Sequence, residues 1–143
     1  MVTERQPTPS DDAAIPDGAL AEREPVAGSL ADAPLEVDDL FEVLCRPDNR
    51  YVLTYLLMTD EPVSYHDLVE FVVDRTETPE SLTKGEYRGR VLTRFLHSTF
   101  PKLAERGLLE YDRDDQMLVE TEYTALALPY LRVALLQQDV GLD

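Results

Sequence analysis

The chain has 143 residues, the length of one ordinary domain, and 29 Asp and Glu against 13 Lys and Arg give it a formal net charge of -16. No apolar run reaches the roughly 18 residues of a membrane-spanning helix, and the N-terminus lacks the apolar core of a secretory signal, so we expect a cytoplasmic protein without a membrane partner. One cysteine and two histidines exclude an intramolecular disulfide and a Cys/His zinc site.

The net charge by itself argues against a nucleic-acid partner, because phosphates repel a polyanion. However, a high acidic content with only two lysines is also typical of proteins from salt-saturated, halophilic cytoplasms. At about 1 M salt the Debye length is roughly 3 Å, so local chemistry rather than total charge decides which partner binds. We therefore interpret the total charge first as a sign of habitat and only second as a sign of partner.

Residues 1–35 differ in composition from the rest of the chain. They hold five of the ten prolines and no aromatic residue, and seven acids face two bases. Such a segment cannot bury enough apolar area to offset the entropy lost on ordering. The sequence therefore predicts a disordered, acidic, Pro-rich tail over residues 1–35.

Two helices are predicted at the start of the folded part. The first begins near Val37, with acids in its first turn, and is interrupted at Pro47. A second apolar run at helical spacing covers residues 50–58, and we expect Asp48 or Asn49 to cap it.

A third helix is predicted over residues 65–75, after a turn at residues 59–62. Ser64 stands three residues before Asp67, which is the spacing of a capping box with Asp in place of the usual Glu. Residues 76–85 contain proline, glycine and several hydroxyl side chains, so we expect a loop there.

A long helix is predicted over residues 86–106. One side of its helical wheel is apolar and collects Val91, Leu92, Phe95, Leu96, Thr99 and Leu103. Arg90, Arg94 and His97 fall on the opposite side, with Thr93 beside them. Pro101 should kink or split this helix, because its ring clashes with the carbonyl of His97. Gly107 is a suitable residue to end it.

The last part of the chain predicts a hairpin and one more helix. Residues 108–112 and 117–121 are two short runs around a polar turn that lacks glycine. A helix follows over residues 122–138, with a kink expected at Pro129. Arg132 is its one charged residue between Tyr123 and Gln138, so apolar side chains spread around most of the wheel. This pattern favours dimerisation through the helix; the alternative is that the helix only wraps its own domain.

The order of these elements, with a short turn between two helices and a hairpin after the second, is the layout of a winged helix-turn-helix. The stretch from Phe100 to Asp112 is similar to the end of the recognition helix and the first wing strand of winged-helix regulators. With Asp39-Leu40-Phe41 and residues 46–56, it resembles small winged-helix proteins of haloarchaea, mostly of unassigned role. The resemblance covers residues 36–121.

This resemblance implies a mainly α (α+β) fold and an archaeal transcription regulator that binds double-stranded DNA. The winged-helix domain would span residues 36–121, and residues 122–143 would form a C-terminal helix that makes a homodimer. Winged-helix dimers of this kind read paired half-sites on the duplex.

The candidate DNA-binding residues lie in the most basic part of the chain, where six bases face two acids between residues 84 and 106. We expect residues 86–106 to enter the major groove, where arginine contacts phosphates or pairs with guanine O6 and N7. The expected contacts are Arg90, Thr93, Arg94, His97 and Lys102. The alternative is that these bases pair with surface carboxylates; Arg88, on the apolar side of the wheel, is expected to have a structural role.

The predicted hairpin tip favours a second function. Asp112, Asp114 and Asp115 surround Arg113, and these acids would repel a phosphate backbone. The alternative is therefore a winged-helix module that binds proteins and not DNA. We expect no enzyme activity, cofactor, metal or small-molecule ligand, since the sequence has no Gly-rich phosphate loop, catalytic triad or metal-ligand cluster.

Overall fold

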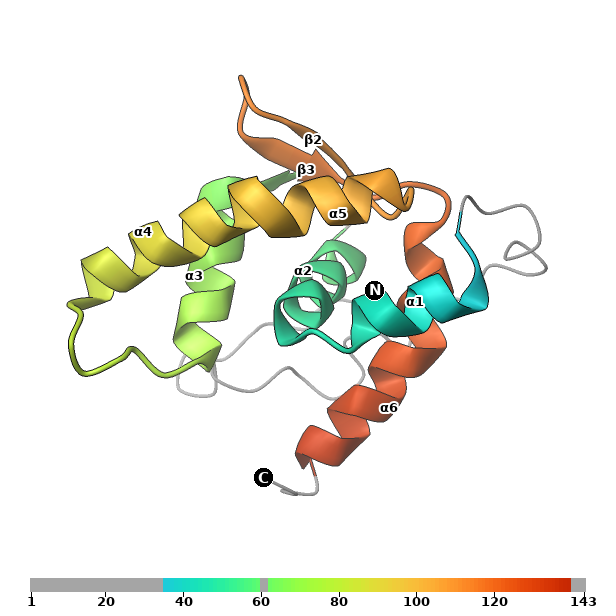
Figure 1. Ribbon diagram of the computed structural model, residues 1–143, viewed down its shortest axis with the longest axis horizontal. Coiled ribbons are helices and arrows are strands. Elements are labelled where there is room, and N and C mark those ends of the chain that lie inside the picture. The colour runs from blue at the N-terminus through green and yellow to red at the C-terminus, as the bar shows by residue number, and fades with distance from the viewer. Residues whose placement is uncertain (1–34, 60–61, 140–143) are drawn as a thin grey trace, which may run out of the picture.

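The computed structural model describes residues 35–59 and 62–139, with side chains to residue 134 (Figure 1). The first 34 residues of the predicted 1–35 tail and the centre of the predicted 59–62 turn lie outside the described residues. The tail prediction is wrong at Leu35, whose apolar side chain is buried in the core. The described chain is mostly helical and has a small three-stranded antiparallel sheet, which confirms the α+β class.

The elements follow one another along the chain as α1 (Val37–Leu44), α2 (Pro47–Met58), β1 (Val63–Ser64), α3 (Tyr65–Arg75), α4 (Lys84–Arg94), the π-helical turn η3 (Phe95–Thr99), α5 (Phe100–Glu105), β2 (Glu110–Asp112), β3 (Met117–Val119), the 3-10 turn η4 (Thr124–Ala127) and α6 (Leu128–Asp139).

The start of α2 corrects the prediction. The helix begins at Pro47, with Arg46 as its N-cap residue, and not after a cap at Asp48 or Asn49. Proline fits the first helical position because the N–H that it lacks would have no partner there. Asn49 is buried instead, and its amide donates a 2.8 Å hydrogen bond to the carbonyl of Val43, which ties α2 to the end of α1.

α3 has the predicted bounds, and the Ser64 hydroxyl accepts a 3.0 Å hydrogen bond from the Asp67 N–H. The strand β1 just before it was not predicted. Val63 pairs with Leu118 of β3, so the predicted hairpin becomes a sheet with the order β1-β3-β2. A strand of two residues is too short to show an alternating pattern in the sequence.

α4 begins at Lys84, within the segment predicted as loop. The Thr83 hydroxyl accepts a hydrogen bond from the Glu86 N–H at 3.0 Å, and the Glu86 carboxylate accepts one from the Thr83 N–H at 2.9 Å. This reciprocal capping box satisfies two backbone donors and so starts the helix at this point.

The long helix ends at Gly107, as predicted. Gly107 has a φ of 78°, a left-handed conformation that glycine adopts at little energetic cost. The Gly107 N–H donates to the carbonyl of Ala104 at 3.0 Å, and the Leu108 N–H donates to that of Leu103 at 2.9 Å. These two bonds form a Schellman motif, which turns the chain directly into the hairpin.

The hairpin of β2 and β3 is present as predicted, with shorter strands that pair Glu110 with Val119. Its turn needs no glycine, for two reasons. The Asp112 carboxylate accepts hydrogen bonds from the N–H groups of Asp114 and Asp115, at 2.8 and 3.1 Å. Gln116 takes the left-handed conformation, with φ of 57°.

The last predicted helix is divided in two. Residues 124–127 form the 3-10 turn η4, and Pro129 lies in the first turn of α6, where it causes no kink. The buried Thr124 hydroxyl donates a 2.7 Å hydrogen bond to the carbonyl of Leu108. This bond fixes the start of the C-terminal segment against the base of the hairpin.

Candidate nucleic-acid interface

The long helix across the molecule is continuous because a π turn replaces the predicted kink (Figure 1). Pro101 has no N–H, and its ring would clash with the carbonyl of His97 in a regular α-helix. In η3 the Phe100 N–H bonds to the carbonyl of Phe95, five residues before it. This turn holds one more residue than an α-helical turn, which accommodates the proline without breaking the helix.

The π turn also decides which side chains face outward after it. In a regular α-helix, at about 100° per residue, Phe100 would point about 180° away from the buried Val91, and Lys102 would lie within about 20° of it. The observed arrangement is the reverse: Phe100 is fully buried, and Lys102 is exposed. The extra residue therefore keeps Phe100 in the core and turns Lys102 to the surface.

The predicted site residues are consequently brought together on one side of the helix, which we call the outer face. Arg90 and Thr93 of α4, His97 of η3 and Lys102 of α5 are all exposed. Among the described side chains, those of residues 35–59 and 62–134, no ion pair joins Arg90, His97 or Lys102 to an acid. Their polar groups are open to a partner in solution.

Arg94, at the edge of the outer face, has an acidic partner. Its Nε donates to Oδ2 of Asp48 at 2.6 Å, and its Nη2 donates to Oδ1 at 3.0 Å. The hydrogen bond to Asp48 raises the pKa of the Arg94 guanidinium, and burial opposes this in part. For Arg94 the structure thus contains the ion pair that the sequence left open as the alternative to DNA contact.

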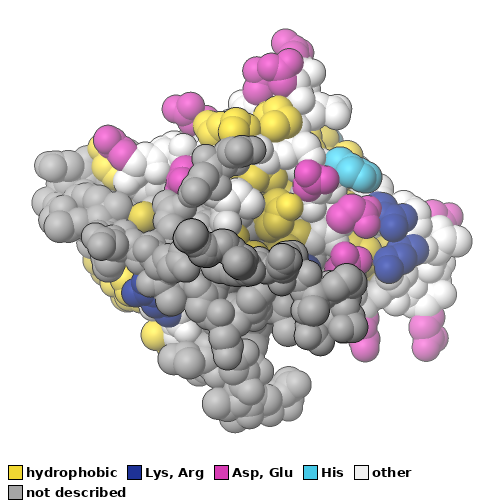
Figure 2. Space-filling model, turned by 180° about the vertical axis from the view of Figure 1, so that it is seen from behind, with side chains coloured by type: hydrophobic (Ala, Val, Ile, Leu, Met, Phe, Trp, Pro, Cys, Tyr) yellow, Lys and Arg dark blue, Asp and Glu magenta, His cyan; other side chains and the backbone are white. Residues whose placement is uncertain are grey.

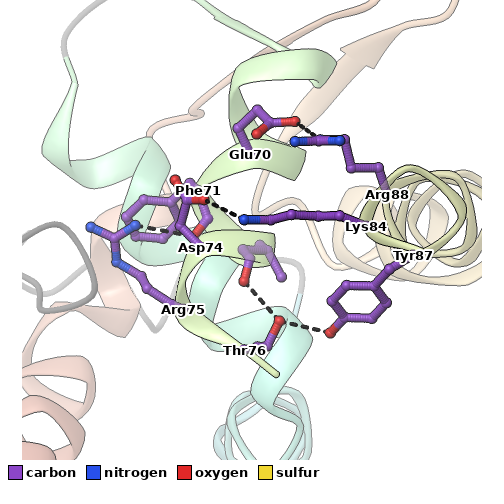
Figure 3. A network of polar contacts seen from close by, with 9 residues as sticks. Glu70, Phe71, Asp74, Arg75, Thr76, Lys84, Tyr87 and Arg88 are labelled. Carbon is purple, nitrogen blue, oxygen red and sulfur yellow. Dashed lines mark hydrogen bonds and ion pairs between the residues drawn. The ribbon is translucent and has the colours of Figure 1, made fainter. Parts of the chain in front are cut away.

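Further polar contacts join the start of α4 to α3, as Figure 3 shows. Arg88 pairs with Glu70, and Lys84 lies 4.0 Å from the carboxylate of Asp74. The Tyr87 hydroxyl shares a 2.7 Å hydrogen bond with that of Thr76. We call these three contacts the α3–α4 clamp, and they agree with the structural role expected for Arg88.

The other end of the long helix is held in a similar way. Arg106 lies 3.5 Å from a carboxylate oxygen of Asp39 and 3.7 Å from one of Glu42, both on α1. Four of the six bases between residues 84 and 106 therefore contact acids on other helices: Lys84, Arg88, Arg94 and Arg106.

The tip of the hairpin is acidic, as the sequence indicated. Asp112, Asp114 and Asp115 are exposed, and acidic side chains gather at the top of the molecule in Figure 2. Arg113 is exposed among them and has no ion pair within the described part of the chain. Its single charge leaves the tip net negative.

A third surface feature lies on α1 and α6, where four large hydrophobic side chains are exposed among the described ones: Val37 (41%), Phe41 (47%), Tyr130 (38%) and Val133 (56%). The rings of Phe41 and Tyr130 meet edge to face, with centroids 5.3 Å apart. We call these four residues the α1/α6 patch. The sequence predicted exposed apolar residues on the last helix but not the contribution of α1.

Sequence reasoning missed Asp48 as part of this region. It stands 46 residues before Arg94, and no local pattern connects the two. Among the described residues, no group of His, Cys, Asp and Glu is placed to hold a metal ion, and no helix is long and apolar enough to cross a membrane.

Comparison with known families places the chain in one of them. Residues 41–119, more than half of the chain, match the model of a family described as a domain of unknown function (DUF7344), and the chain belongs to that family. No curated protein and no solved structure matches the sequence.

Proposed function

We propose that this member of a family without an assigned function is a transcription regulator that binds double-stranded DNA through the outer face of its long helix. The observation that carries the proposal is the outer face itself. In a chain of net charge -16, Arg90 and Lys102 project from one side of one helix with no acid of the described residues paired to them.

The arrangement of elements supports a winged helix-turn-helix. β1 lies between α2 and α3, the long helix follows α3, and the hairpin follows the long helix. The sheet order β1-β3-β2 brings the hairpin beside the start of α3. In a winged helix this order makes the long helix the recognition helix, which lies in the major groove.

The residues of the outer face have distinct chemical roles in this proposal. Arg90 pairs with guanine or with a phosphate, and Thr93 and His97 offer hydrogen-bonding groups to base edges. Lys102, beyond the π turn, contacts a phosphate as a point charge. Phosphate contacts fix the register on the duplex, and base contacts supply the specificity.

The acidic hairpin tip must stay away from the phosphates in such a complex. Counterion release contributes little in molar salt, because the logarithm of the affinity falls linearly with the logarithm of the salt concentration. A regulator that works there depends more on contacts to base edges than on a basic wing. An acidic tip therefore costs such a protein less than it would at low salt.

We assign the α1/α6 patch to a second copy of the chain. Between Leu128 and Ala134, α6 carries one charged residue, Arg132, so the α6 side of the patch holds no acid, whereas on α1 the exposed Asp38 and Glu42 stand beside Val37 and Phe41. A two-fold dimer buries the same patch from both copies and presents two recognition helices to paired half-sites. At high salt the repulsion between the two acidic chains is screened.

The acidic tip favours a second candidate function, a protein-interaction module that binds no DNA. In that case the exposed Asp114 and Asp115 would meet a basic partner, and Arg90 and Lys102 would remain solvated.

The two functions are separated by selecting from a randomised duplex library with the full chain at 1 and 3 M KCl and sequencing the bound fraction. A regulator enriches a motif, and the Arg90→Ala/Lys102→Ala variant binds that motif more weakly when affinity is measured at low salt. Lys84→Ala is the matched control, because it removes one charge from α4 at a lysine that already faces Asp74. If the wild type enriches no motif, the DNA-binding function is wrong.

The dimer is tested by light scattering of the full chain at the same salt. The wild type is expected at twice the chain mass, and Phe41→Ser/Tyr130→Ser is expected to be monomeric. A Thr93→Ser variant, on the outer face, should remain dimeric. A wild type that stays monomeric at high concentration would contradict the assignment.

A further inference from the structure

The contact between Arg94 and Asp48 leaves one edge of the guanidinium open. Arginine has five N–H donors in a planar fork. Asp48 accepts from Nε and from one N–H of Nη2, which are the donors on the side of the fork. The end of the fork, with Nη1 and the second N–H of Nη2, is not used by Asp48. No hydrogen bond of the described residues uses this end, and the side chain of Arg94 as a whole is 45% exposed.

The open edge has the geometry that guanine requires. Two parallel N–H donors of an arginine match the O6 and N7 acceptors of guanine in the major groove. Arg94 lies one helical turn after Arg90, at the border of the outer face. A guanine at that border would therefore contact the end of the Arg94 fork, while Asp48 holds the side of the fork.

Asp48 is itself held in place. It lies in the first turn of α2, directly after Pro47, and its side chain is 25% exposed. The acidic residue also suits the positive end of that helix. The two hydrogen bonds to Asp48 therefore fix the orientation of Arg94 before any partner arrives, which lowers the entropy cost of binding.

The pair also changes how Arg94 responds to salt. Asp48 cancels most of the guanidinium charge, so the attraction to a phosphate is weak. A hydrogen-bonded base contact does not depend on counterion release and keeps its strength at high salt. Arg90 has no acidic partner among the described residues, so its attraction to a phosphate is stronger and depends more on the salt concentration.

We propose that Asp48 is a positioning residue that makes Arg94 a reader of guanine rather than a phosphate contact. This inference rests on the proposed function, since it assumes that the outer face meets duplex DNA. It adds a base identity, guanine in the major groove, and a residue outside the long helix that determines specificity.

The test uses the duplex obtained by the selection, with single guanines replaced one at a time. The analogue 7-deazaguanine lacks the N7 acceptor, and inosine keeps N7 and O6 while losing only the minor-groove amino group. At one position the wild type should lose about tenfold in affinity with 7-deazaguanine and little with inosine. Asp48→Asn removes the charge at nearly constant size and should reduce that discrimination to about twofold.

The same variant should bind unrelated duplex more tightly, and its salt slope should steepen by about 1, because Arg94 regains a free charge. Arg94→Lys, which keeps the charge and loses the fork, is the second variant and should lose the discrimination in the same way. Thermal unfolding of both variants checks that they are folded.

Two results would overturn the inference. If Asp48→Asn and the wild type show equal discrimination and equal salt slopes, Asp48 does not position Arg94, although the proposed function stands. If the wild type binds no duplex at all, the proposed function fails and the inference fails with it.

Discussion

Two sets of bases on the same helix differ in what surrounds them. Arg90 and Lys102 project from the outer face without an ion pair among the described residues, whereas the four bases at the helix edges contact acids of α1, α2 and α3: Lys84, Arg88, Arg94 and Arg106. A local excess of positive charge in an acidic chain therefore does not by itself mark a binding face. The bases that other helices leave unpaired keep all their donors for a partner, whereas Arg94, paired with Asp48, keeps only those at the end of its fork.

The edge bases also have a structural consequence. Exposed ion pairs each contribute little to stability, typically below about 1 kcal/mol. Several of them along one helix still favour one orientation of that helix on the domain. The bases at the edges position the helix, and the bases of the outer face, together with the free end of the Arg94 fork, remain for recognition.

The largest effect is expected on stability, at the π turn that brings Lys102 to the outer face beside Arg90. Phe100→Ala removes a fully buried ring that packs against Phe95 and Tyr65, and should cost about 3–5 kcal/mol in unfolding free energy. Urea denaturation measures this loss. Lys102→Ala, two residues on, is the control and should change stability by less than about 0.5 kcal/mol. Equal losses in both variants would contradict the register described for η3.

The next largest effect is expected on DNA affinity when the two unpaired bases of the outer face, Arg90 and Lys102, are removed. Arg90→Ala/Lys102→Ala should lower affinity for the selected duplex by about 100-fold at low salt and flatten the salt slope by about 2, one for each lost phosphate contact. Fluorescence anisotropy over a salt series gives both values. If the edge-set variant Lys84→Ala loses as much affinity, the distinction between the two sets is wrong.

A smaller effect on the free energy of unfolding is expected when one of the bases that contact acids on other helices is removed. Arg88→Ala should lower unfolding free energy by about 1 kcal/mol, and Lys84→Ala by less, because the Lys84 contact with Asp74 is longer and more exposed. A double-mutant cycle between Arg88 and Glu70 should give a coupling of about 0.5–1 kcal/mol. A coupling of zero would show that the α3–α4 clamp does not hold the helix.

The smallest effect is expected at the hairpin tip. Asp114→Asn/Asp115→Asn should raise DNA affinity by about twofold to threefold at low salt and leave it unchanged at 3 M KCl. Stability should not change, since Asp112, which accepts the hydrogen bonds of the turn, is kept. Weaker DNA binding in this variant would mean that the acidic tip takes part in the complex.

Local patterns predicted much of this fold and part of the site. Ser64, Gly107 and the apolar stripe of the long helix mark structure through contacts with near neighbours in the chain, so they are readable from the sequence. The capping box of Thr83 and Glu86 was readable in the same way and was missed.

The remaining features depend on contacts between distant parts of the chain. The π turn is one of two responses to Pro101, and the need to bury Phe100 decides between them. β1 forms only because β3 lies beside it. The partner of Arg94 comes from α2, so no spacing on the long helix could show that this arginine is paired while Arg90 is not.

The most direct test of DNA binding by the outer face is duplex selection with the wild-type full chain at 1 and 3 M KCl, followed by affinity measurement on the enriched sequence at low and high salt. We predict an enriched motif that contains guanine, with binding that Arg90→Ala/Lys102→Ala weakens by about 100-fold at low salt and Lys84→Ala preserves. No enrichment at either salt concentration, with a folded protein, would contradict it.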